Sequence, residues 1–407
     1  MADPEELDME GEENFQNEDD RPEEEDEETI RIREAVQKFK EDIKSGLSQI
    51  SKIQNNQSWA YVKLNLAEKE LDKLYPPLLE YKHLRHLDIS GNALTDISLV
   101  TDLQFLTTLN CSKNQIPSLS VFNPEADEPI LPYLQFLDLS GNKIQILENI
   151  KIGRLRKLVL NENEIVTAQG FEGHPTLEYL EIKQNKVKNL QGFINMPNLK
   201  ELNLEENEIT HFRDLRDLPK LQKVILAKNK IKKIKAPLPY LPSMTYLSLA
   251  ENEITQFPEV LSLAHLTTLN SIALQGNDIQ DVEDIKVEIL IFMDHFIEIN
   301  DEIVKKSDRA QAKEVLDSRI EEAERLKKEE EEEQERIRLE EEERLKQEEE
   351  ERLAKEEEER KEREEQERIE KEQAEKEKQE QEEQQKKEQE EAEKQKQEEN
   401  PENKENA

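Results

Sequence analysis

The side chains that could do chemistry in this chain recur at one position of a repeated pattern. In nine successive Leu-x-x-Leu-x-Leu segments, the residue before the second apolar position reads His86, Thr108, Phe136, Lys157, Tyr179, Glu201, Lys223, Tyr246 and Ser271. Exposed aromatics among charges are typical anchors of protein interfaces. This row predicts a protein-binding surface, and its candidate contact residues are His86, Phe136, Lys157, Tyr179, Glu201, Lys223 and Tyr246. The alternative is that the N-terminal segment or the C-terminal tail covers some of the aromatics.

Catalytic and metal-binding patterns are absent from the sequence. The chain has nine glycines, six histidines and one cysteine. It contains no phosphate-binding glycine loop, nucleophile motif or ligand-type His and Cys spacing. We expect His86 and His174 to be surface residues and Cys111, at an apolar position of its repeat, to be a small core residue. The sequence therefore predicts a protein that is not an enzyme and has no cofactor or metal.

A repeat of about 22 residues must position this row. Between Tyr61 and Ile279 the pattern Leu-x-x-Leu-x-Leu-x-x-Asn-x-Ile occurs ten times, and only the first unit, with Lys69, lacks the Asn. Stacked units of this kind form an α/β solenoid, the leucine-rich repeat horseshoe, whose leucines lie inside and whose strands form one curved parallel sheet. The Asn side chains can satisfy buried backbone groups of the turns. This structural ladder comprises Asn92, Asn114, Asn142, Asn163, Asn185, Asn207, Asn229, Asn252 and Asn277.

The segments that return the chain from one strand to the next are short. A 22-residue unit leaves room for only a short helical or 3₁₀ turn, as expected for residues 207–221, where apolar residues recur at every third position. One unit is longer by about six residues, and its Pro- and Ser-rich insertion between Pro117 and Pro132 has no apolar period. We expect this insertion to loop out at the rim of the solenoid.

Both ends of the solenoid need covers. At the front, apolar residues at helical spacing predict an amphipathic capping helix from about residue 30 to 53: Ile32, Val36, Phe39, Ile43, Leu47 and Ile50, with Trp59 just beyond. At the back, a dense apolar block after Asn277 should close the core: Ile285, Val287, Ile289, Leu290, Phe292, Phe296, Ile297 and Ile299.

The charge is concentrated in the two ends of the chain. Of the net −39, residues 1–30 carry −15 and residues 307–407 carry −19, which leaves −5 for the rest. The predicted division is an acidic disordered segment 1–29, a capping helix 30–58, repeats 59–284, a C-terminal cap 285–306, a charged helix 307–396 and a disordered end 397–407. Such acidity opposes binding to nucleic acid, anionic membranes and microtubules, so the expected partner is a protein.

The tail has a period of eight residues from Glu341 onward. At 3.6 residues per turn this period moves the apolar position around the helix, which disfavours a coiled coil. It also places many Glu residues four positions before a Lys or Arg, as in Glu342 and Lys346 or Glu359 and Arg363. We therefore predict a single monomeric helix; a disordered Glu-rich tail is the alternative.

The N-terminal residues contain no secretory signal, and no apolar run is long enough to span a bilayer. We expect a cytosolic protein. The entry repeats resemble those of the ciliary leucine-rich repeat-containing protein 23 family: the resemblance rests on residues 60–64, Leu71, residues 83–90, Asn92 and residues 94–96, and on Met293, Phe296 and Ile299 in the cap. It spans roughly residues 55–330. Two features depart from that family: no Pro lies near Asp294, and the charged helix is much longer.

The resemblance implies a component of the radial spokes of the axoneme, a scaffold in the cytoskeleton of the cilium or flagellum, with other spoke subunits as partners and a single copy in a large complex. Two alternatives stay open. One is a regulatory subunit of a protein phosphatase 1-like catalytic subunit, because the phosphatase-1 regulatory solenoid has the same short repeat. The other is an acidic histone-chaperone-like repeat protein, although the 24 basic residues among the 43 acidic ones after Lys306 are unusual for that class.

Overall fold

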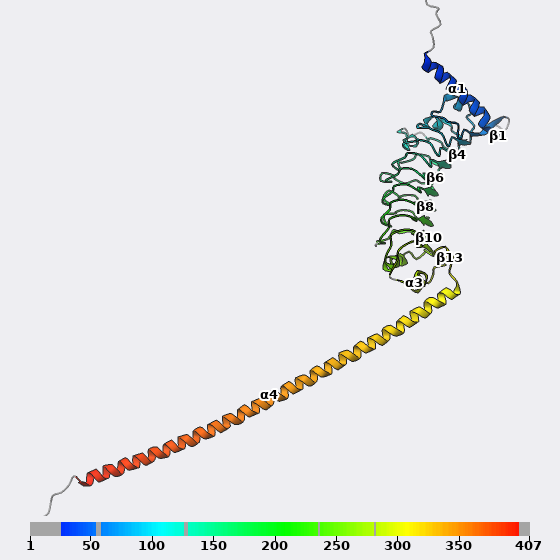
Figure 1. Ribbon diagram of the computed structural model, residues 1–407. Coiled ribbons are helices and arrows are strands. Elements are labelled where there is room, and N and C mark those ends of the chain that lie inside the picture. The colour runs from blue at the N-terminus through cyan, green and yellow to red at the C-terminus, as the bar shows by residue number, and fades with distance from the viewer. Residues whose placement is uncertain (1–25, 54–57, 126–128, 235–236, 281, 399–407) are drawn as a thin grey trace, which may run out of the picture. The chain divides into compact units, whose positions relative to one another are not determined.

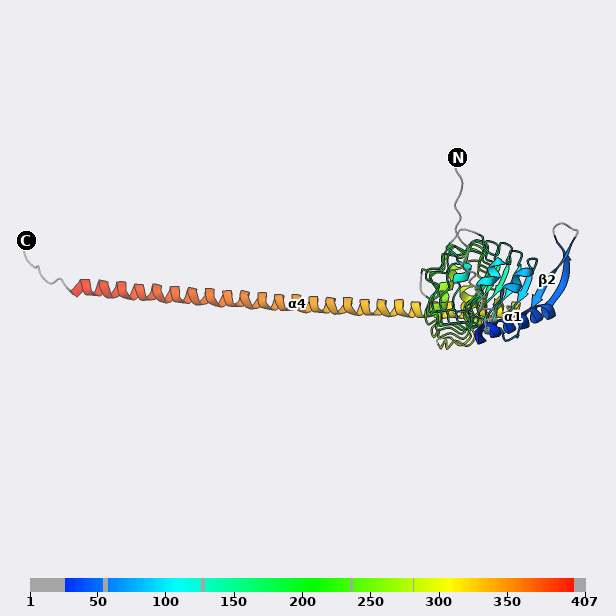
Figure 2. The ribbon, with the colours of Figure 1, turned by 90° about the horizontal axis from the view of Figure 1, so that it is seen from above.

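The computed structural model describes residues 26–53, 58–125, 129–234, 237–280 and 282–398. These residues form two compact units, which divide between Val315 and Leu316. The first unit is a solenoid and the second is a stretch of helix (Figures 1 and 2). The expected disordered ends, 1–29 and 397–407, lie mostly outside the described residues.

The described part of the solenoid contains one sheet of 13 strands in sequence order. Its strands from β2 to β12 are parallel, whereas β1 and β13 pair antiparallel at the two edges. The bounds are β1 Leu47–Lys52, β2 Trp59–Asn65, β3 His86–Asp88, β4 Thr108–Asn110, β5 Phe136–Asp138, β6 Lys157–Val159, β7 Tyr179–Glu181, β8 Glu201–Asn203, β9 Lys223–Ile225, β10 Tyr246–Ser248, β11 Ser271–Ala273, β12 Glu298–Ile299 and β13 Glu302–Ile303.

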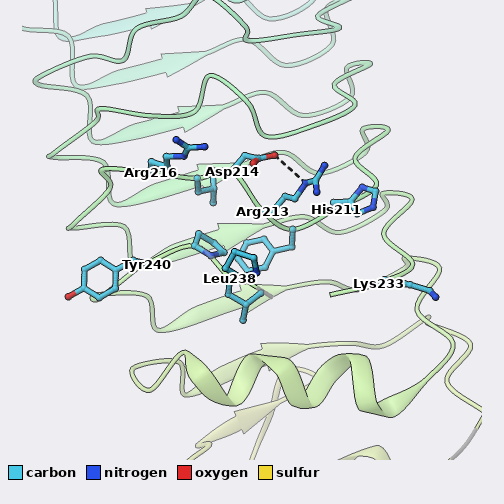
Figure 3. A pocket seen from close by; sticks show the side chains of 11 residues that line it. His211, Arg213, Asp214, Arg216, Lys233, Leu238 and Tyr240 are labelled. Carbon is cyan, nitrogen blue, oxygen red and sulfur yellow. Dashed lines mark ion pairs between the residues drawn. The ribbon is translucent and has the colours of Figure 1, made fainter. Parts of the chain in front are cut away.

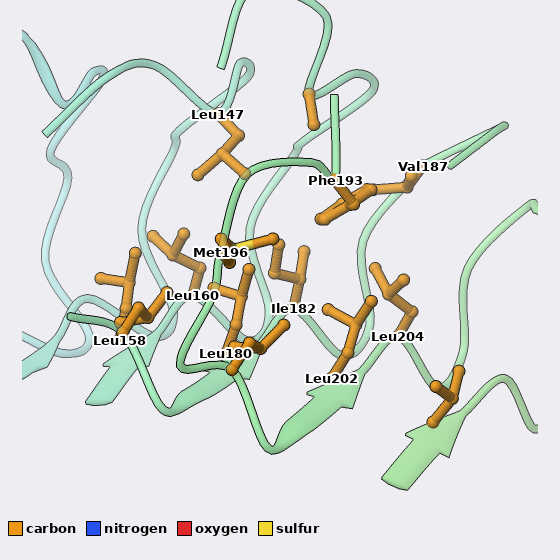
Figure 4. Close-up of a cluster of buried hydrophobic side chains, with 14 of the residues drawn as sticks. Leu147, Leu158, Leu160, Leu180, Ile182, Val187, Phe193, Met196, Leu202 and Leu204 are labelled. Atoms are coloured by element: carbon orange, nitrogen blue, oxygen red, sulfur yellow. The ribbon is translucent and has the colours of Figure 1, made fainter. Parts of the chain in front are cut away.

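One continuous core runs through the stacked repeats. The middle residue of each short strand and the residue two positions later point into it, as Leu180 and Ile182 do. Figure 4 shows these side chains meeting Phe193 and Met196, which come from a return segment. Cys111 is fully buried, as expected, and burial raises the pKa of its thiol well above the usual value. The solenoid is therefore filled by apolar contacts between neighbouring units.

Each ladder asparagine lies between two adjacent turns and forms hydrogen bonds with backbone groups of both. Asn207 accepts a hydrogen bond from the amide of Val187 at 3.0 Å and donates from Nδ2 to the carbonyls of Ile182 and Leu204 at 2.8 and 3.0 Å. Asn92 takes over this role for the first unit, because its Oδ1 accepts from the amides of both Lys69 and Leu71. Each such side chain joins its own turn to the preceding one, so the turns are satisfied only as a stack.

The return segments carry fewer helices than the spacing predicts. Short helices occur near both ends of the array, at η1 Pro76–Glu80, η2 Ser98–Asp102, η3 Ser120–Phe122, α2 Phe257–Leu261 and η4 Ser262–His265. Residues 207–221 form bends and turns instead, so the expected helical turn there was wrong. The long unit also differs from expectation, because Leu119, Phe122 and Leu131 are buried and stack on their neighbours. Residues 126–128 of its insertion lie outside the described residues.

The N-terminal cap is a helix followed by a strand. Helix α1, Glu27–Gly46, begins at an Asp26 side chain that caps the amide of Thr29 and packs Phe39 and Ile43 on the core. The expected helix to residue 53 was too long, because Leu47–Lys52 form β1 against β2. Gly46, the last residue of the helix, lies close against β2, and a Cβ there would clash with the carbonyl oxygen of Asn65. The helix backbone can approach β2 only at a residue without a side chain.

The C-terminal cap combines helix α3, Ile285–Phe292, with the β12–β13 hairpin. Asn300 and Asp301 have φ of 52° and 61°, the left-handed pair that a two-residue hairpin turn requires. Val287, Ile289, Leu290, Phe296 and Ile299 are buried. Phe292 and Ile297 are each 55% exposed, so they do not close the core as expected.

Helix α4 spans Lys306–Glu398, 93 residues, or about 140 Å at 1.5 Å per residue. From Asp317 to Glu390 all its side chains are exposed. Pairs expected from the sequence form at Glu342–Lys346, 2.9 Å, and Glu359–Arg363, 3.7 Å. In the described part of the chain, neither this helix nor another has an apolar stretch that could cross a bilayer.

Candidate protein-binding surface

The predicted row of side chains occupies a single line across the sheet. His86 pairs in register with Thr108, Thr108 with Phe136, and the line continues strand by strand to Ser271. The middle residue of each strand points into the core, so the residue before it faces the opposite, concave side. The concave face of the parallel sheet is the candidate protein-binding surface. Ser271 is the exception, because it is 6% exposed and bonds through Oγ to Glu298.

A hollow of about 180 Å³ lies at the N-terminal part of this face. It is lined by Lys63, His86, Thr108 and Phe136 together with the strand residues between them. His86 Nδ1 is 2.8 Å from Thr108 Oγ1. Burial, and then the nearby charges of Lys63 and Arg85, lower the pKa of His86. The imidazole is therefore neutral at pH 7, and the hollow offers a half-buried ring and an aromatic wall.

The charges in the middle of the row are compensated within the protein. Lys157 pairs with Glu181 at 2.7 Å, and Lys223 pairs with Glu201 at 3.3 Å, each across two adjacent repeats. Burial opposes ionisation of Glu181, but hydrogen bonds from Lys157 and Asn161 outweigh it and lower its pKa. These partly exposed pairs contribute little stability each. They leave the middle of the face polar but close to neutral.

The three candidate aromatics differ in exposure. Tyr179 is 37% exposed. Phe136 and Tyr246 are half-buried, and Lys223 Nζ lies 5.5 Å from the Tyr246 ring centroid. Burial, followed by the charge of Asp301, raises the pKa of Tyr246. Tyr179 is therefore the more accessible anchor, whereas Tyr246 is partly engaged within the sheet.

An exposed aromatic patch extends the concave face beyond the predicted row. Trp59 is 63% exposed and Tyr61 is 43% exposed, and both share a face of β2 with Lys63. Ile50, 56% exposed, stands opposite Tyr61 in the antiparallel pair, and Lys52 lies 5.7 Å from the Trp59 ring. The sequence signal for this patch was the alternation of Trp59, Tyr61 and Lys63, which was hidden by the expectation of a helix up to this point.

The histidines are less exposed than expected. His174 is 3% exposed, and its Nε2 lies 3.1 Å from the carbonyl oxygen of Ile152. Burial lowers its pKa, although the bond to Ile152 opposes this effect. The expected surface position was wrong, because the ring fills the space between two return segments. Across the described ranges, no three His, Cys, Asp or Glu side chains are grouped to hold a metal ion.

The family models that match the chain agree with the solenoid geometry. The family model described as Leucine-rich repeat matches residues 174–258 and 198–329, and the model described as Leucine Rich repeats (2 copies) matches residues 82–124. A solved leucine-rich repeat protein of Leptospira interrogans is 24% identical, covers 58% of this chain and 60% of its own, and has a TM-score of 0.45. The family-model matches and the solenoid geometry together show the leucine-rich repeat fold.

Curated relatives confirm the more specific resemblance. Leucine-rich repeat-containing protein 23 of Homo sapiens is 37% identical over 130 residues, which is 32% of this chain and 36% of that protein. The protein of the same name from Bos taurus is 35% identical over 130 residues. The match thus spans about a third of the length of these relatives.

Proposed function

We propose that this protein is a non-enzymatic structural adaptor of the ciliary axoneme, which assembles or stabilises a radial spoke through contacts on its concave face. The resemblance to leucine-rich repeat-containing protein 23 supports the ciliary assignment. The observation that carries the adaptor role is the concave face itself. Tyr61 and Tyr179 project from a sheet whose strands are fixed on both sides, so little ordering entropy is lost when a partner binds them.

The partner class follows from the chemistry of that face. Its charges are paired between repeats, as in Lys157–Glu181 and Lys223–Glu201, so it lacks the excess positive charge that a nucleic acid would need. Its hollow is small and open, and its accessible side chains are aromatic. Such a face fits a protein surface that supplies apolar groups and hydrogen bonds. In this proposal the long helix extends along a second component as a strut.

The test is an affinity purification of the tagged full-length chain from a salt extract of axonemes and, in parallel, from cytosol. Lysine cross-linking and mass spectrometry then identify what lies against the concave face. The proposal predicts radial spoke subunits cross-linked to Lys63, Lys157 or Lys183, which lie along the concave side of the repeats. Recovery of a phosphatase catalytic subunit or of histones at these lysines, with no spoke subunit, would overturn it in favour of those classes.

A further inference from the structure

A second surface lies on the return segments between β7 and β10, away from the concave row. Two adjoining hollows of about 620 and 670 Å³ share Leu215, Arg216 and Tyr240. The first is lined by basic side chains: His211, Arg213, Arg216 and Lys233. Figure 3 shows His211 and Arg213 on one turn of the solenoid, Lys233 on the next, and Tyr240 at the other end of the pocket. The hollows therefore span adjacent repeats.

The positive charge of this surface is unusual for the chain and is largely uncompensated. Residues 209–243 contain nine Lys or Arg and two Asp in a protein of net charge −39. Other lysines in this stretch form ion pairs: Lys228 and Lys230 pair with the preceding repeat at 2.8 and 2.9 Å, and Lys232 pairs with Glu253 of the following repeat at 3.2 Å. Around the hollow Arg213 meets Asp214 at 3.4 Å, but the described residues give the side chains of Arg216 and Lys233 neither a hydrogen bond nor an ion pair.

The second hollow is mainly apolar and adjoins these cations, and Asp217 also lines it. Its walls include Leu218 and three prolines, Pro197, Pro219 and Pro242. Tyr240 stands between the two hollows with 84% of its surface exposed. A Tyr side chain has only two torsion angles, so its ordering on binding costs little for the large contact area that it provides. The surface thus offers an apolar cradle beside Arg216 and Lys233, two cations whose side chains have no partner among the described residues.

We propose that this surface, the Tyr240 cradle, binds an acidic linear segment of a partner protein, with an apolar side chain in the proline-lined hollow and carboxylates on Arg216 and Lys233. This is a second contact, independent of the concave face. Charge complementarity selects the occupant, because cations without internal partners attract carboxylates. A nucleic acid is disfavoured, because the net charge of −39 repels a polyanion at long range and a single ring, Tyr240, provides no platform for successive bases.

The experiment measures fluorescence anisotropy of a rhodamine-labelled synthetic peptide, Glu-Asp-Glu-Leu-Phe-Asp-Glu-Asp, with the full-length protein. The test variants are Arg216→Glu with Lys233→Glu, and separately Tyr240→Ala. The matched control is Lys73→Glu with Lys82→Glu, which changes the net charge equally at exposed lysines of the first repeat units. Three further peptides replace all carboxylates by amides, replace Leu-Phe by Ala-Ala, or place the same charge on phosphoserines. A deletion of residues 1–25 tests whether an acidic end of this chain competes.

The proposal predicts saturable binding that weakens at least about tenfold in the double charge reversal and in Tyr240→Ala, and by less than about twofold in the control. Binding should weaken with added salt and should be lost with the amide peptide and the Ala-Ala peptide. Equal loss in the control and test variants would overturn it, as would preference for the phosphoserine peptide. Binding that appears only after deletion of residues 1–25 would show that this chain's own segment occupies the cradle. That result would contradict the proposal that the occupant belongs to a partner protein. No binding by either form would also overturn it.

Discussion

The solenoid and the outer part of α4 are held by opposite kinds of interaction. In the solenoid, each ladder asparagine bonds backbone groups of two turns inside a continuous apolar core. In α4 beyond Leu316, the described side chains are exposed and the ion pairs join residues three or four positions apart. The stability of the solenoid therefore depends on contacts between neighbouring repeats, and its geometry is fixed. The stability of the helix is a sum of weak ion pairs, which added salt weakens. This difference supports our proposal that the solenoid carries the recognition surface and that the helix spans a distance.

The largest effect is expected from breaking the ladder at its centre. Asn207→Leu leaves the Val187 amide and the Ile182 carbonyl without this partner, whereas the Leu204 carbonyl keeps its hydrogen bond from Asn229 at 3.0 Å. Each stranded buried group costs about 1–3 kcal/mol, so the thermal midpoint should fall by many degrees. Thermal melts of the full chain measure this. The exposed Asn189→Leu is the matched control, and equal midpoints for the two variants would contradict the buried role of Asn207.

A smaller effect is expected from acid acting on His174. Burial lowers its folded pKa, so the unfolded chain takes up the proton first as the pH falls below about 6.5. The stability held by the neutral ring is therefore present above that pH and is lost below it, by at most about 1.4 kcal/mol per pH unit. Melts at pH 7.5 and 5.5 should show His174→Gln losing less stability on acidification than the wild type. Parallel pH dependence of the variant and the wild type would contradict this assignment.

The contact between α3 and the start of α4 should respond only at lower pH. A hydrogen bond from Lys286, at 2.8 Å, and another from the Lys305 amide lower the pKa of Asp308 to about 2. Its contribution is thus present above the usual value of 3.8 and is lost as the pH falls through about 2. The difference in thermal midpoint between wild type and Asp308→Asn should be small, constant above pH 5, and should shrink from pH 4 to 2. A difference that grows on acidification would contradict the sign of this shift.

The smallest effect per residue is expected in the tail. Each exposed pair of residues 307–395 contributes only about 0.2–0.5 kcal/mol, so no single substitution such as Lys346→Gln should unfold the helix. Circular dichroism of the isolated tail should show high helicity that declines gradually as salt rises to about 1 M. Sedimentation should show a monomer. Dimerisation with concentration, or low helicity at low salt, would remove the contrast with the solenoid.

Repetition made the solenoid predictable from the sequence. The spacing of Asn185, Asn207 and Asn229 fixes the register, because a shifted unit would bury charge and expose leucine. The row from His86 to Tyr246 followed from the same register. Features that occur once were missed: Leu47 and Ile50 continue a helical spacing, but they pair with β2 as strand β1. A local pattern cannot reveal a contact between distant segments.

The burial and the ion pairing of individual side chains could not be predicted from the sequence either. His174 and Ser271 are at positions that the repeat leaves open, yet neighbouring segments cover them. The pairing of Lys157 with Glu181 depends on side chains from adjacent repeats meeting across the sheet. The Tyr240 cradle required the return segments of three repeats to be placed together, and their irregular turns have no sequence period. Burial and charge compensation therefore had to come from the structure.

The central claim is that the concave face, and not the helix, retains the partner. The most direct measurement is co-sedimentation of the chain with axonemes from which the endogenous protein has been extracted. It compares the wild type with three variants. These are the double variant Trp59→Ala/Tyr179→Ala, the control Tyr133→Ala outside the concave row, and a deletion of residues 330–407. The account predicts that the double variant is lost from the pellet with an unchanged melting temperature, whereas the control and the deletion are retained. Loss of the deletion variant with retention of the double variant would contradict it and make the helix the principal docking element.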